Sequence, residues 1–143
     1  MIKESVDTAT KISIQKNLKI PIILGVTVLT SLSIDDILNM GWSNSLNEQV
    51  YRFASIAIDS GCNGLVCSAL ELEFLRKKLG DKIILVTPGI RPDWSRKNDQ
   101  ERIVTPKQAI SLGANYLVIG RPITNAKDPK IALSRIIDEI NEN

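Results

Sequence analysis

The amino-acid sequence predicts an α/β fold built on a parallel β-sheet, and two features of the chain indicate it. Four runs of residues are continuously apolar instead of alternating with polar residues, as strands buried on both faces of a parallel sheet require. These runs are residues 20–29, 64–67, 82–87 and 116–120. Segments with helical periodicity separate them, so strand and helix alternate along the chain in the pattern of repeated βα units.

The composition is that of a folded globular domain. Of the 143 residues, 43% are apolar, 24% are charged and 4% are aromatic, which is a soluble balance. The net charge of +2 arises from 18 basic and 16 acidic residues spread along the chain, so neither a nucleic acid nor a membrane surface is an expected partner. The longest apolar run, residues 20–29, is too short to span a bilayer, and we expect a cytoplasmic protein.

The absence of histidine restricts the chemistry that the chain can perform. With no imidazole in the sequence, catalytic triads and acid–base schemes that depend on histidine are excluded. Cys62 and Cys67 have no histidine with which to complete a zinc site. We therefore expect two buried, reduced thiols, and neither a metal nor a cofactor.

Helices are expected at residues 45–60, 69–79, 105–112 and 128–141, with a shorter one near 34–39. Two of them begin with a capping box, Ser45 with Glu48 and Thr105 with Gln108, in which each side chain satisfies a backbone N–H at the helix start. Asp128 is the expected N-cap of the last helix, since a proline follows it at the first helical position.

The sequence also indicates where the helices end and which structure the first residues adopt. Glycine is favoured just past a helix end, where the backbone often turns left-handed, and the expected positions are Gly41, Gly61, Gly80 and Gly113. Residues 1–17 have the pattern of an amphipathic helix that leads into the first strand. We therefore expect these 143 residues to start on a helix, with no strand before it.

Repeated right-handed βα units form either an open doubly wound sheet or a closed barrel. Four strands are few for the first arrangement and are half of the second, which typically needs about 250 residues. The expected fold is half of a (β/α)₈ TIM barrel, with four parallel strands and covering helices, and residues 1–143 form a single truncated barrel domain.

Ligands of such folds bind at the carboxyl ends of the strands, so the residues just after each apolar run are the candidates for a binding site. The last run ends at Gly120 and Arg121, where a glycine lets a phosphate oxygen approach the backbone and a guanidinium offers a forked set of donors. The third run ends at Pro88 and opens a long polar loop that contains Arg91 and Gln100. A loop of this length usually forms part of a binding site, and both side chains can donate to the same anion.

The other two runs give weaker signals. Thr30 follows the first run, where its hydroxyl could contact the edge of a polar ring. Ser68 follows the second run, and its better interpretation is as the N-cap of the next helix.

Plainer interpretations of the same residues stay open. Arg121 can be a surface arginine, Arg91 and Gln100 can be solvated loop residues, and Thr30 can close a turn at a strand end. The adjacent pair Asp35-Asp36 looks like a pair of acid–base carboxylates, but capping of a short helix explains it better. The residues alone indicate an α/β protein that binds a phosphorylated small molecule.

Five blocks in the right order resemble the C-terminal half of the orotidine 5′-phosphate decarboxylase family, which catalyses the last step of pyrimidine nucleotide synthesis. The blocks are VTVLTS (26–31), GLVCSA (64–69), LVTPGIRP (85–92), DQ (99–100) with RIVTP (102–106), and YLVIGRPIT (116–124). Together they extend over nearly all of the chain from residue 21 onward, so the resemblance rests on more than one motif.

The resemblance implies a (β/α)₈ barrel that acts as a homodimer without a cofactor and converts orotidine monophosphate into uridine monophosphate and carbon dioxide. It implies these substrate-binding residues: Thr30 at the pyrimidine, Pro88 lining the pocket, Arg91 near the ligand, Gln100 linking base and phosphate, and Gly120 with Arg121 at the phosphate. Binding energy from the remote phosphate can stabilise the transition state at the ring.

The sequence departs from the family in one respect that concerns catalysis. The family's catalytic groups are an alternating array of lysine and aspartate centred on an Asp-x-Lys-x-x-Asp motif, which occurs nowhere in the 143 residues. The lysine would protonate the developing carbanion, and the aspartates would stress the carboxylate of the substrate. We therefore assign no catalytic residue and expect the chain alone to be inactive.

Three hypotheses about function remain at this point. The chain can belong to an orotidine phosphate decarboxylase whose N-terminal half is encoded separately or lost, or it can be a non-catalytic remnant that binds a phosphorylated ligand. A different phosphate-binding barrel enzyme, such as a sugar-phosphate epimerase, is a third hypothesis, because a fold does not fix its chemistry. The expected partners are orotidine or uridine monophosphate, together with a second copy of the chain or a separate N-terminal half.

Overall fold

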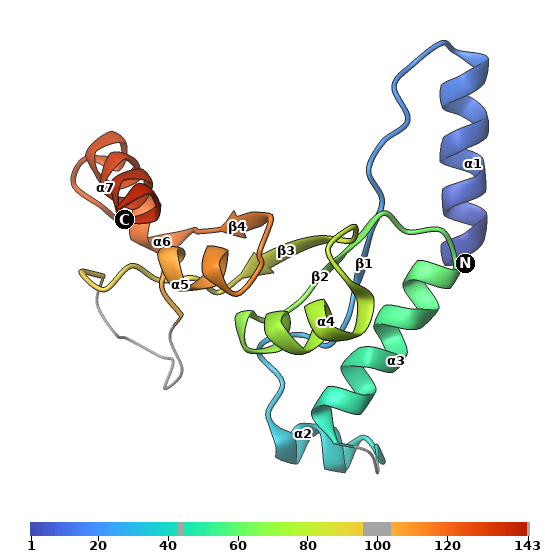
Figure 1. Ribbon diagram of the computed structural model, residues 1–143, viewed down its shortest axis with the longest axis horizontal. Coiled ribbons are helices and arrows are strands. Elements are labelled where there is room, and N and C mark those ends of the chain that lie inside the picture. The colour runs from blue at the N-terminus through green and yellow to red at the C-terminus, as the bar shows by residue number, and fades with distance from the viewer. Residues whose placement is uncertain (43–44, 96–103, 143) are drawn as a thin grey trace.

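The structure is a computed structural model of the chain, and it describes residues 1–42, 45–95 and 104–142. The elements in chain order are α1 (Ile2–Gln15), β1 (Leu24–Val26), α2 (Ile34–Asn39), α3 (Leu46–Asp59), β2 (Gly64–Val66), the 3₁₀ helix η1 (Ala69–Glu71), α4 (Leu72–Leu79), β3 (Ile84–Pro88), α5 (Pro106–Ser111), β4 (Tyr116–Val118), α6 (Arg121–Thr124) and α7 (Pro129–Asn141). The predicted alternation of strand and helix is confirmed (Figure 1).

The four strands form one parallel sheet in the order β1-β2-β3-β4. Their register places Val26, Val66, Val86 and Tyr116 in one row across the sheet. Each strand pairs with the next one along the chain, so the ends that bear the loops after the strands all lie along the same edge. That carboxyl edge is where a parallel α/β fold places its ligand.

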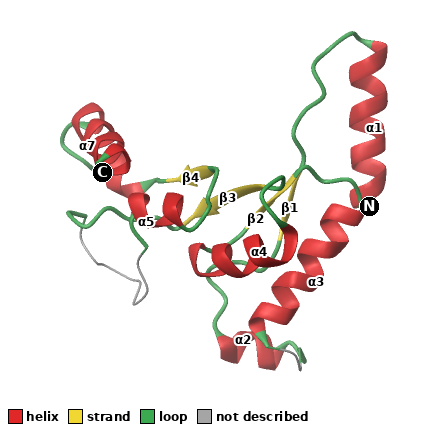
Figure 2. Cartoon of the chain, in the orientation of Figure 1, coloured by secondary structure: helices red, strands yellow, loops and turns green. Residues whose placement is uncertain are grey.

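Helices cover one face of this sheet. The side chains of Leu65, Cys67, Leu85 and Thr87 are at most 1% exposed and alternate with residues that point the other way. Helix α3 contacts β1 and β2, and α3, α4 and α5 lie on the same side of the sheet in Figure 2. We call this the helix-covered face.

The opposite face is apolar and only partly covered, and we call it the open face. Its side chains are those of Val26, Val66, Val86, Tyr116 and Val118, of which Val26, Tyr116 and Val118 are exposed. The expectation that every strand is buried on both faces is therefore wrong for the two outer strands. The reason is geometric, because β1 and β4 each have a neighbouring strand on one side only among the described elements.

The first strand is also much shorter than the predicted run 20–29. Strand β1 consists of Leu24–Val26, whereas Ile20 and Ile22 are exposed coil. Pro21 has no N–H to donate to a ladder, and pairing with β2 begins only at the register pair Leu24 and Gly64. The length of an apolar run therefore overestimates the length of a strand that pairs with only one neighbour.

Both predicted capping boxes are confirmed, at Ser45 with Glu48 and at Thr105 with Gln108. Asp128 caps α7 as expected, because its carboxylate accepts the N–H groups of Lys130 and Ile131. The predicted helix 69–79 is divided into η1 and α4, since Ser68 and Glu71 form a capping box of their own. The helix ends at Gly41, Gly61, Gly80 and Gly113 all have positive φ angles.

Two asparagines fasten neighbouring strands where the strands begin. Asn63 accepts the N–H of Ile23 at 2.9 Å, and its own N–H donates to the Ile23 carbonyl at 2.8 Å. Asn115 does the same to Leu85, at 2.8 and 2.9 Å. Both asparagines lie two residues after a left-handed glycine that ends a helix. The same helix end and the same pair of hydrogen bonds therefore occur twice in the chain.

Candidate functional site

The sequence-predicted site residues lie along the carboxyl edge of the sheet, with one outside the described residues. Pro88 is the last residue of β3, and Gly120 and Arg121 lie just past β4. Thr30 follows β1 after a short connection. Gln100 falls in residues 96–103, which lie outside the described part of the chain. Of the described members, Arg91 and Arg121 line one cavity and Thr30 and Pro88 line another, whereas Gly120 precedes Arg121 in the chain and lines neither.

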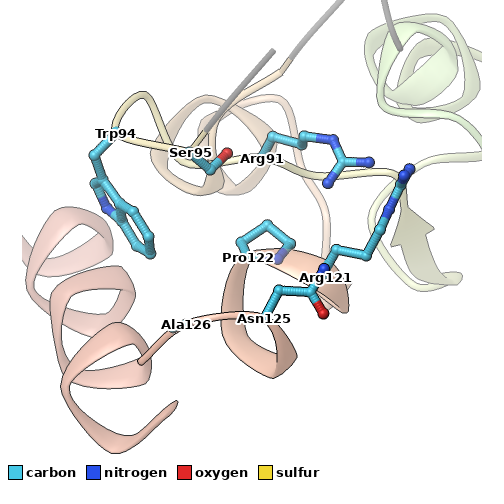
Figure 3. A pocket seen from close by; sticks show the side chains of 7 residues that line it. All are labelled: Arg91, Trp94, Ser95, Arg121, Pro122, Asn125 and Ala126. Atoms are coloured by element: carbon cyan, nitrogen blue, oxygen red, sulfur yellow. The ribbon is translucent and has the colours of Figure 1, made fainter. Parts of the chain in front are cut away.

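The first cavity brings two arginines together, and we call it the arginine cavity (Figure 3). Its volume is about 520 Å³, and its lining residues are Arg91, Trp94, Ser95, Arg121, Pro122, Asn125 and Ala126. Among these described lining residues none is acidic. Two guanidinium groups in one cavity favour an anion, since each offers charge-assisted donors in a planar fork.

Arg91 is positioned by bonds of its own backbone. Its N–H donates to the carbonyl of Val104 at 3.2 Å, which joins the start and the end of the β3–α5 connection. Four residues further on, the backbone N–H and the hydroxyl of Ser95 both donate to the carbonyl of Pro92, at 3.0 and 2.9 Å. Pro92 is fully buried, so this first part of the loop is anchored on the core.

Arg121 is positioned by the start of a short helix. It is the first residue of α6, and Gly120 is the N-cap, whose carbonyl accepts the N–H groups of Ile123 and Thr124. A Cβ atom added to Gly120 would meet no protein atom within 4 Å. The space beside this glycine is therefore available to a ligand, which is what a phosphate grip at a strand end requires.

Trp94 forms a further wall of the arginine cavity, although no motif in the sequence indicates a role for it. The guanidinium of Arg135 on α7 lies over the indole ring, 4.5 Å from its centroid, in the geometry of a cation–π contact. The contact holds the loop that carries Arg91 against α7. Only the packing of α7 brings Arg135 to the loop, so no local sequence pattern could have revealed the pair.

The second cavity lies at the mouths of β1, β2 and β3, and we call it the strand-mouth cavity. Its volume is about 1000 Å³, and it brings Thr30 and Pro88 together with Ser68 and Glu71. Gly89 also lines it, and Arg91, which lines the arginine cavity, is only two residues further along the chain. The two cavities are thus neighbours on one loop of the carboxyl edge.

Glu71 places a buried carboxyl group in the strand-mouth cavity. The residue is 5% exposed, and its carboxylate accepts the N–H of Ser68 at 3.0 Å. Burial raises the pKa of Glu71 from its ordinary 4.5 to about 7, and the bond from Ser68 opposes the rise without cancelling it. The sequence showed Ser68 as a cap but gave no sign that its partner would be buried.

The two cysteines are free and buried, as expected. Burial, together with a smaller contribution from the nearby Glu71, raises the pKa of the Cys67 thiol to about 12. Such a thiol stays protonated at neutral pH and is a poor nucleophile. The pair Asp35-Asp36 also has the structural role expected of it, because Asp36 completes a capping box with Ser33 at the start of α2.

Two more features of the described chain bear on possible partners. No helix in the described ranges is both long enough and apolar enough to cross a bilayer. Across the same residues, no group of three or more cysteine, aspartate or glutamate side chains is arranged to hold a metal ion.

Fold and site together define a class of protein: a parallel α/β chain with a cationic cavity at the carboxyl edge of its sheet. The particular family follows from comparison with known proteins. The model of the orotidine 5′-phosphate decarboxylase / HUMPS family matches residues 1–136, and the chain belongs to this family. The resemblance noted in the sequence is thereby confirmed.

Relatives show how much of a family member the chain represents. It is 51% identical over 120 residues to the orotidine 5′-phosphate decarboxylase of Rhodospirillum rubrum and 50% identical over 120 residues to that of Hahella chejuensis. These matches cover 84% of this chain but 49% and 52% of the relatives. The chain spans about half the length of the curated relatives it matches.

Solved structures agree with this assignment. The orotidine 5′-phosphate decarboxylase of Lactobacillus acidophilus is 39% identical, with a TM-score of 0.79 over 99% of this chain and 58% of the other. The enzyme of Pyrococcus horikoshii is 22% identical, with a TM-score of 0.63, and supports the fold alone. Because these relatives are TIM barrels of which this chain covers somewhat more than half, the predicted half-barrel is confirmed.

Proposed function

We propose that the chain provides the phosphate- and pyrimidine-binding part of an orotidine 5′-phosphate decarboxylase, which converts orotidine monophosphate into uridine monophosphate and carbon dioxide. One observation carries the proposal: Arg91 and Arg121, from two different connections, meet in a single cavity at the carboxyl edge of the sheet. Membership of the family supports the choice of ligand. Cytoplasmic location remains an expectation from the sequence.

The phosphate of the ligand would lie between Gly120 and the two arginines. The open space beside Gly120 admits an oxygen close to the backbone, and each guanidinium can donate to the remaining oxygens. In this proposal Gln100 contributes the link between phosphate and base that the family resemblance implies.

The pyrimidine would occupy the strand-mouth cavity. Thr30 offers a hydroxyl there, and Pro88 forms part of the wall. Because Gly89 and Arg91 follow Pro88 directly on one loop, a nucleotide can reach from the strand-mouth cavity to the arginine cavity. The proposal therefore assigns the two halves of one ligand to two neighbouring cavities.

We further propose that this chain by itself binds its ligand without decarboxylating it. The Asp-x-Lys-x-x-Asp motif does not occur in the 143 residues, and Glu71 and Cys67, the described groups near the strand mouths whose pKa is raised most, are an acid and a thiol rather than a cationic proton donor. A lysine and aspartate array from a further segment would complete the enzyme. The alternative function is that of a non-catalytic phosphate-binding protein. It would use the same described residues to bind its ligand.

Substitution of Arg121 tests the assignment of the phosphate site. A charge-assisted hydrogen bond contributes about 1.5 to 3 kcal/mol, so Arg121→Ala should weaken binding of uridine monophosphate roughly ten- to a hundredfold. Titration calorimetry of the wild-type chain and the variant, with uridine monophosphate and with inorganic phosphate, measures the change.

Lys11→Ala is the matched control for this titration. It removes one positive charge from an exposed position of α1, far along the chain from the arginine cavity, and should leave both affinities unchanged. Equal affinities for the wild type and Arg121→Ala would reject the assignment of Arg121 to the phosphate site. An equal loss of affinity in Lys11→Ala would show that the net charge of the chain, and not this site, attracts the ligand.

A further inference from the structure

Helix α7 contacts both of the connections that supply an arginine to the arginine cavity. It packs against α6, whose first residue is Arg121. It also packs against α5, which follows the connection that carries Arg91. Because the two arginines come from different parts of the chain, a helix that touches both connections can fix the distance between them.

Two side chains of α7 reach the β3–α5 connection. The guanidinium of Arg135 lies over the ring of Trp94 near the start of the connection, 4.5 Å from the ring centroid. The carboxylate of Glu139 accepts the N–H of Lys107 just past the end of the connection, in a long bond of 3.5 Å. Residues four apart on a helix lie on the same face, so one face of α7 contacts the connection near both of its ends.

The segment 91–94 is short and is held at each end. At its start, the N–H of Arg91 donates to the carbonyl of Val104 at 3.2 Å, and the next residue, Pro92, is fully buried. At its other end, the contact of Trp94 with Arg135 holds the segment on α7. Loss of that contact would free one end of the segment that presents Arg91 to the cavity.

The indole of Trp94 is placed to support the cavity rather than to bind an anion itself. In Figure 3 its ring points toward α7, on the opposite side of the cavity from the guanidinium groups of Arg91 and Arg121. Its Nε1 is buried, and no described residue accepts a hydrogen bond from it. Within the described ranges, packing and the cation of Arg135 therefore orient the ring.

We propose that Arg135 and Trp94 are positioning residues of the anion site: Arg135 holds the Trp94 ring on α7, and this keeps Arg91 where it and Arg121 can donate to one phosphate group. The inference rests on the proposed function only in taking phosphate as the anion. A loop that is ordered before the ligand arrives loses less entropy on binding.

The strength of the contact sets the size of the effect. A contact can shift the equilibrium between two loop arrangements by no more than its own free energy. Arg135 is exposed, and a cation–π contact at an exposed site corresponds to about two- to fivefold in affinity. Trp94 is also a wall of the cavity, so its loss should have at least this effect.

Titration calorimetry of the full chain with inorganic phosphate and with uridine monophosphate measures the contribution. Arg135→Met removes the cation and keeps a long side chain, and it should weaken binding of both ligands about two- to fivefold. Trp94→Leu should weaken binding at least as much. Arg135→Lys keeps a cation and Trp94→Phe keeps an aromatic face, so each conservative variant should recover part of the loss.

A double variant distinguishes positioning from attraction by charge. If Arg135 acts through Trp94, the chain with both Trp94→Leu and Arg135→Met should bind as Trp94→Leu does, because the second substitution removes a contact that is already lost. If Arg135 attracts the anion through space, the two losses should multiply. Trp42→Leu is the matched control: Trp42 packs edge-on against Phe53 of α3, with centroids 5.4 Å apart, and this variant should keep its affinity.

Tryptophan fluorescence tests the contact without any ligand. The sequence has two tryptophans, so Trp42→Phe leaves Trp94 as the single emitting indole. In that background, acrylamide should quench Trp94 more strongly when Arg135→Met is added, and Arg135→Lys should restore part of the protection.

The possible results separate this inference from the proposed function. If Arg121→Ala loses binding but Trp94→Leu and Arg135→Met do not, the inference is wrong and the proposed function stands. Losses that multiply in the double variant, an equal loss in Trp42→Leu, or quenching that Arg135→Met leaves unchanged would also overturn the inference. A wild-type chain that binds neither ligand would reject the proposed function and the inference with it.

Discussion

Glu71 has a buried environment that the sequence does not suggest, and it should give the chain a pH-dependent stability. Its pKa lies at about 7 in the folded chain and near its ordinary 4.5 when burial is lost. Between these values the folded state keeps a proton that the unfolded state releases, so the free energy of unfolding falls as the pH rises from about 4.5 to about 7 and then levels off.

Glu71→Gln should remove this dependence. Glutamine still accepts the N–H of Ser68 in the capping box, but it does not titrate, so the variant should gain stability relative to the wild type as the pH rises, by roughly 3 kcal/mol at most. Urea denaturation at pH 5 and pH 8 measures the gain. Glu4→Gln changes an exposed carboxyl of α1, and a gain of the same size there would show that burial of Glu71 is not the cause.

Substitution of two glycines can distinguish a glycine needed for ligand binding from a glycine needed for folding. A Cβ at Gly120 meets no protein atom within 4 Å, whereas a Cβ at Gly64 collides with the backbone carbonyl of Ile84. Gly120→Ala should therefore change the unfolding free energy by less than about 1 kcal/mol while it weakens phosphate binding. Gly64→Ala should cost about 2 kcal/mol or more through overpacking.

Thermal denaturation and phosphate titration on both glycine variants distinguish these roles. If Gly120→Ala unfolds as easily as Gly64→Ala, the glycine serves the fold. If Gly120→Ala binds phosphate as well as the wild type does, no ligand oxygen approaches that backbone.

The residues of the site were predictable to the extent that they follow a strand directly. Arg121 and Pro88 could be placed at the carboxyl edge because the apolar runs end beside them. A residue that directly follows a parallel strand lies at that edge wherever the rest of the chain folds. Trp94 could not be found in this way, since its role depends on Arg135 of α7. Glu71 could not either, because burial of a side chain depends on elements distant in the sequence.

At the scale of elements, Asn63 and Asn115 hold the start of the sheet by the same pair of bonds. Asn115 also accepts from the guanidinium of Arg76, which donates in addition to the carbonyls of Gly80, Ile83 and Gly113. The end of α4 is thereby tied to the strands on both sides of it. This arrangement fixes where β3 and β4 begin and hence where their carboxyl ends present Arg91 and Arg121.

Asn115→Ala should destabilise the chain by about 1 to 3 kcal/mol, because it leaves the N–H of Leu85 and a donor of Arg76 without their acceptor. Equilibrium unfolding in urea measures the loss. Asn39→Ala, at the exposed end of α2, is the control and should change stability by less than about 0.5 kcal/mol. Similar losses in both variants would mean that the Asn115 bonds contribute little.

Helix boundaries were predicted more closely than strand boundaries for a physical reason. A helix such as α3 or α5 is delimited by local groups, the capping side chain and the glycine beyond its end, which the sequence displays. A strand is delimited by its neighbours, so β1 stops where β2 no longer pairs with it. The short helix α6 was not expected, because Gly120 caps it without a side chain.

At the scale of the whole molecule, we expect the chain to bind its ligand without catalysing the reaction. The purified chain should not release carbon dioxide from orotidine monophosphate above background, since electrostatic stabilisation by groups at the reacting centre is usually the largest contribution to a rate enhancement. The loss of the ultraviolet absorbance of the substrate measures the reaction. A rate that is proportional to protein concentration and survives further purification would show that the described residues are sufficient for catalysis.

The most direct test of the phosphate site compares uridine monophosphate with uridine on the wild-type chain by titration calorimetry. The two ligands share the base and the ribose, so their difference in affinity isolates the phosphate. If the arginine cavity holds that group, uridine monophosphate should bind at least about tenfold more tightly, which corresponds to 1.4 kcal/mol. Equal affinities for the two ligands would contradict the assignment of Arg91, Gly120 and Arg121 to the phosphate.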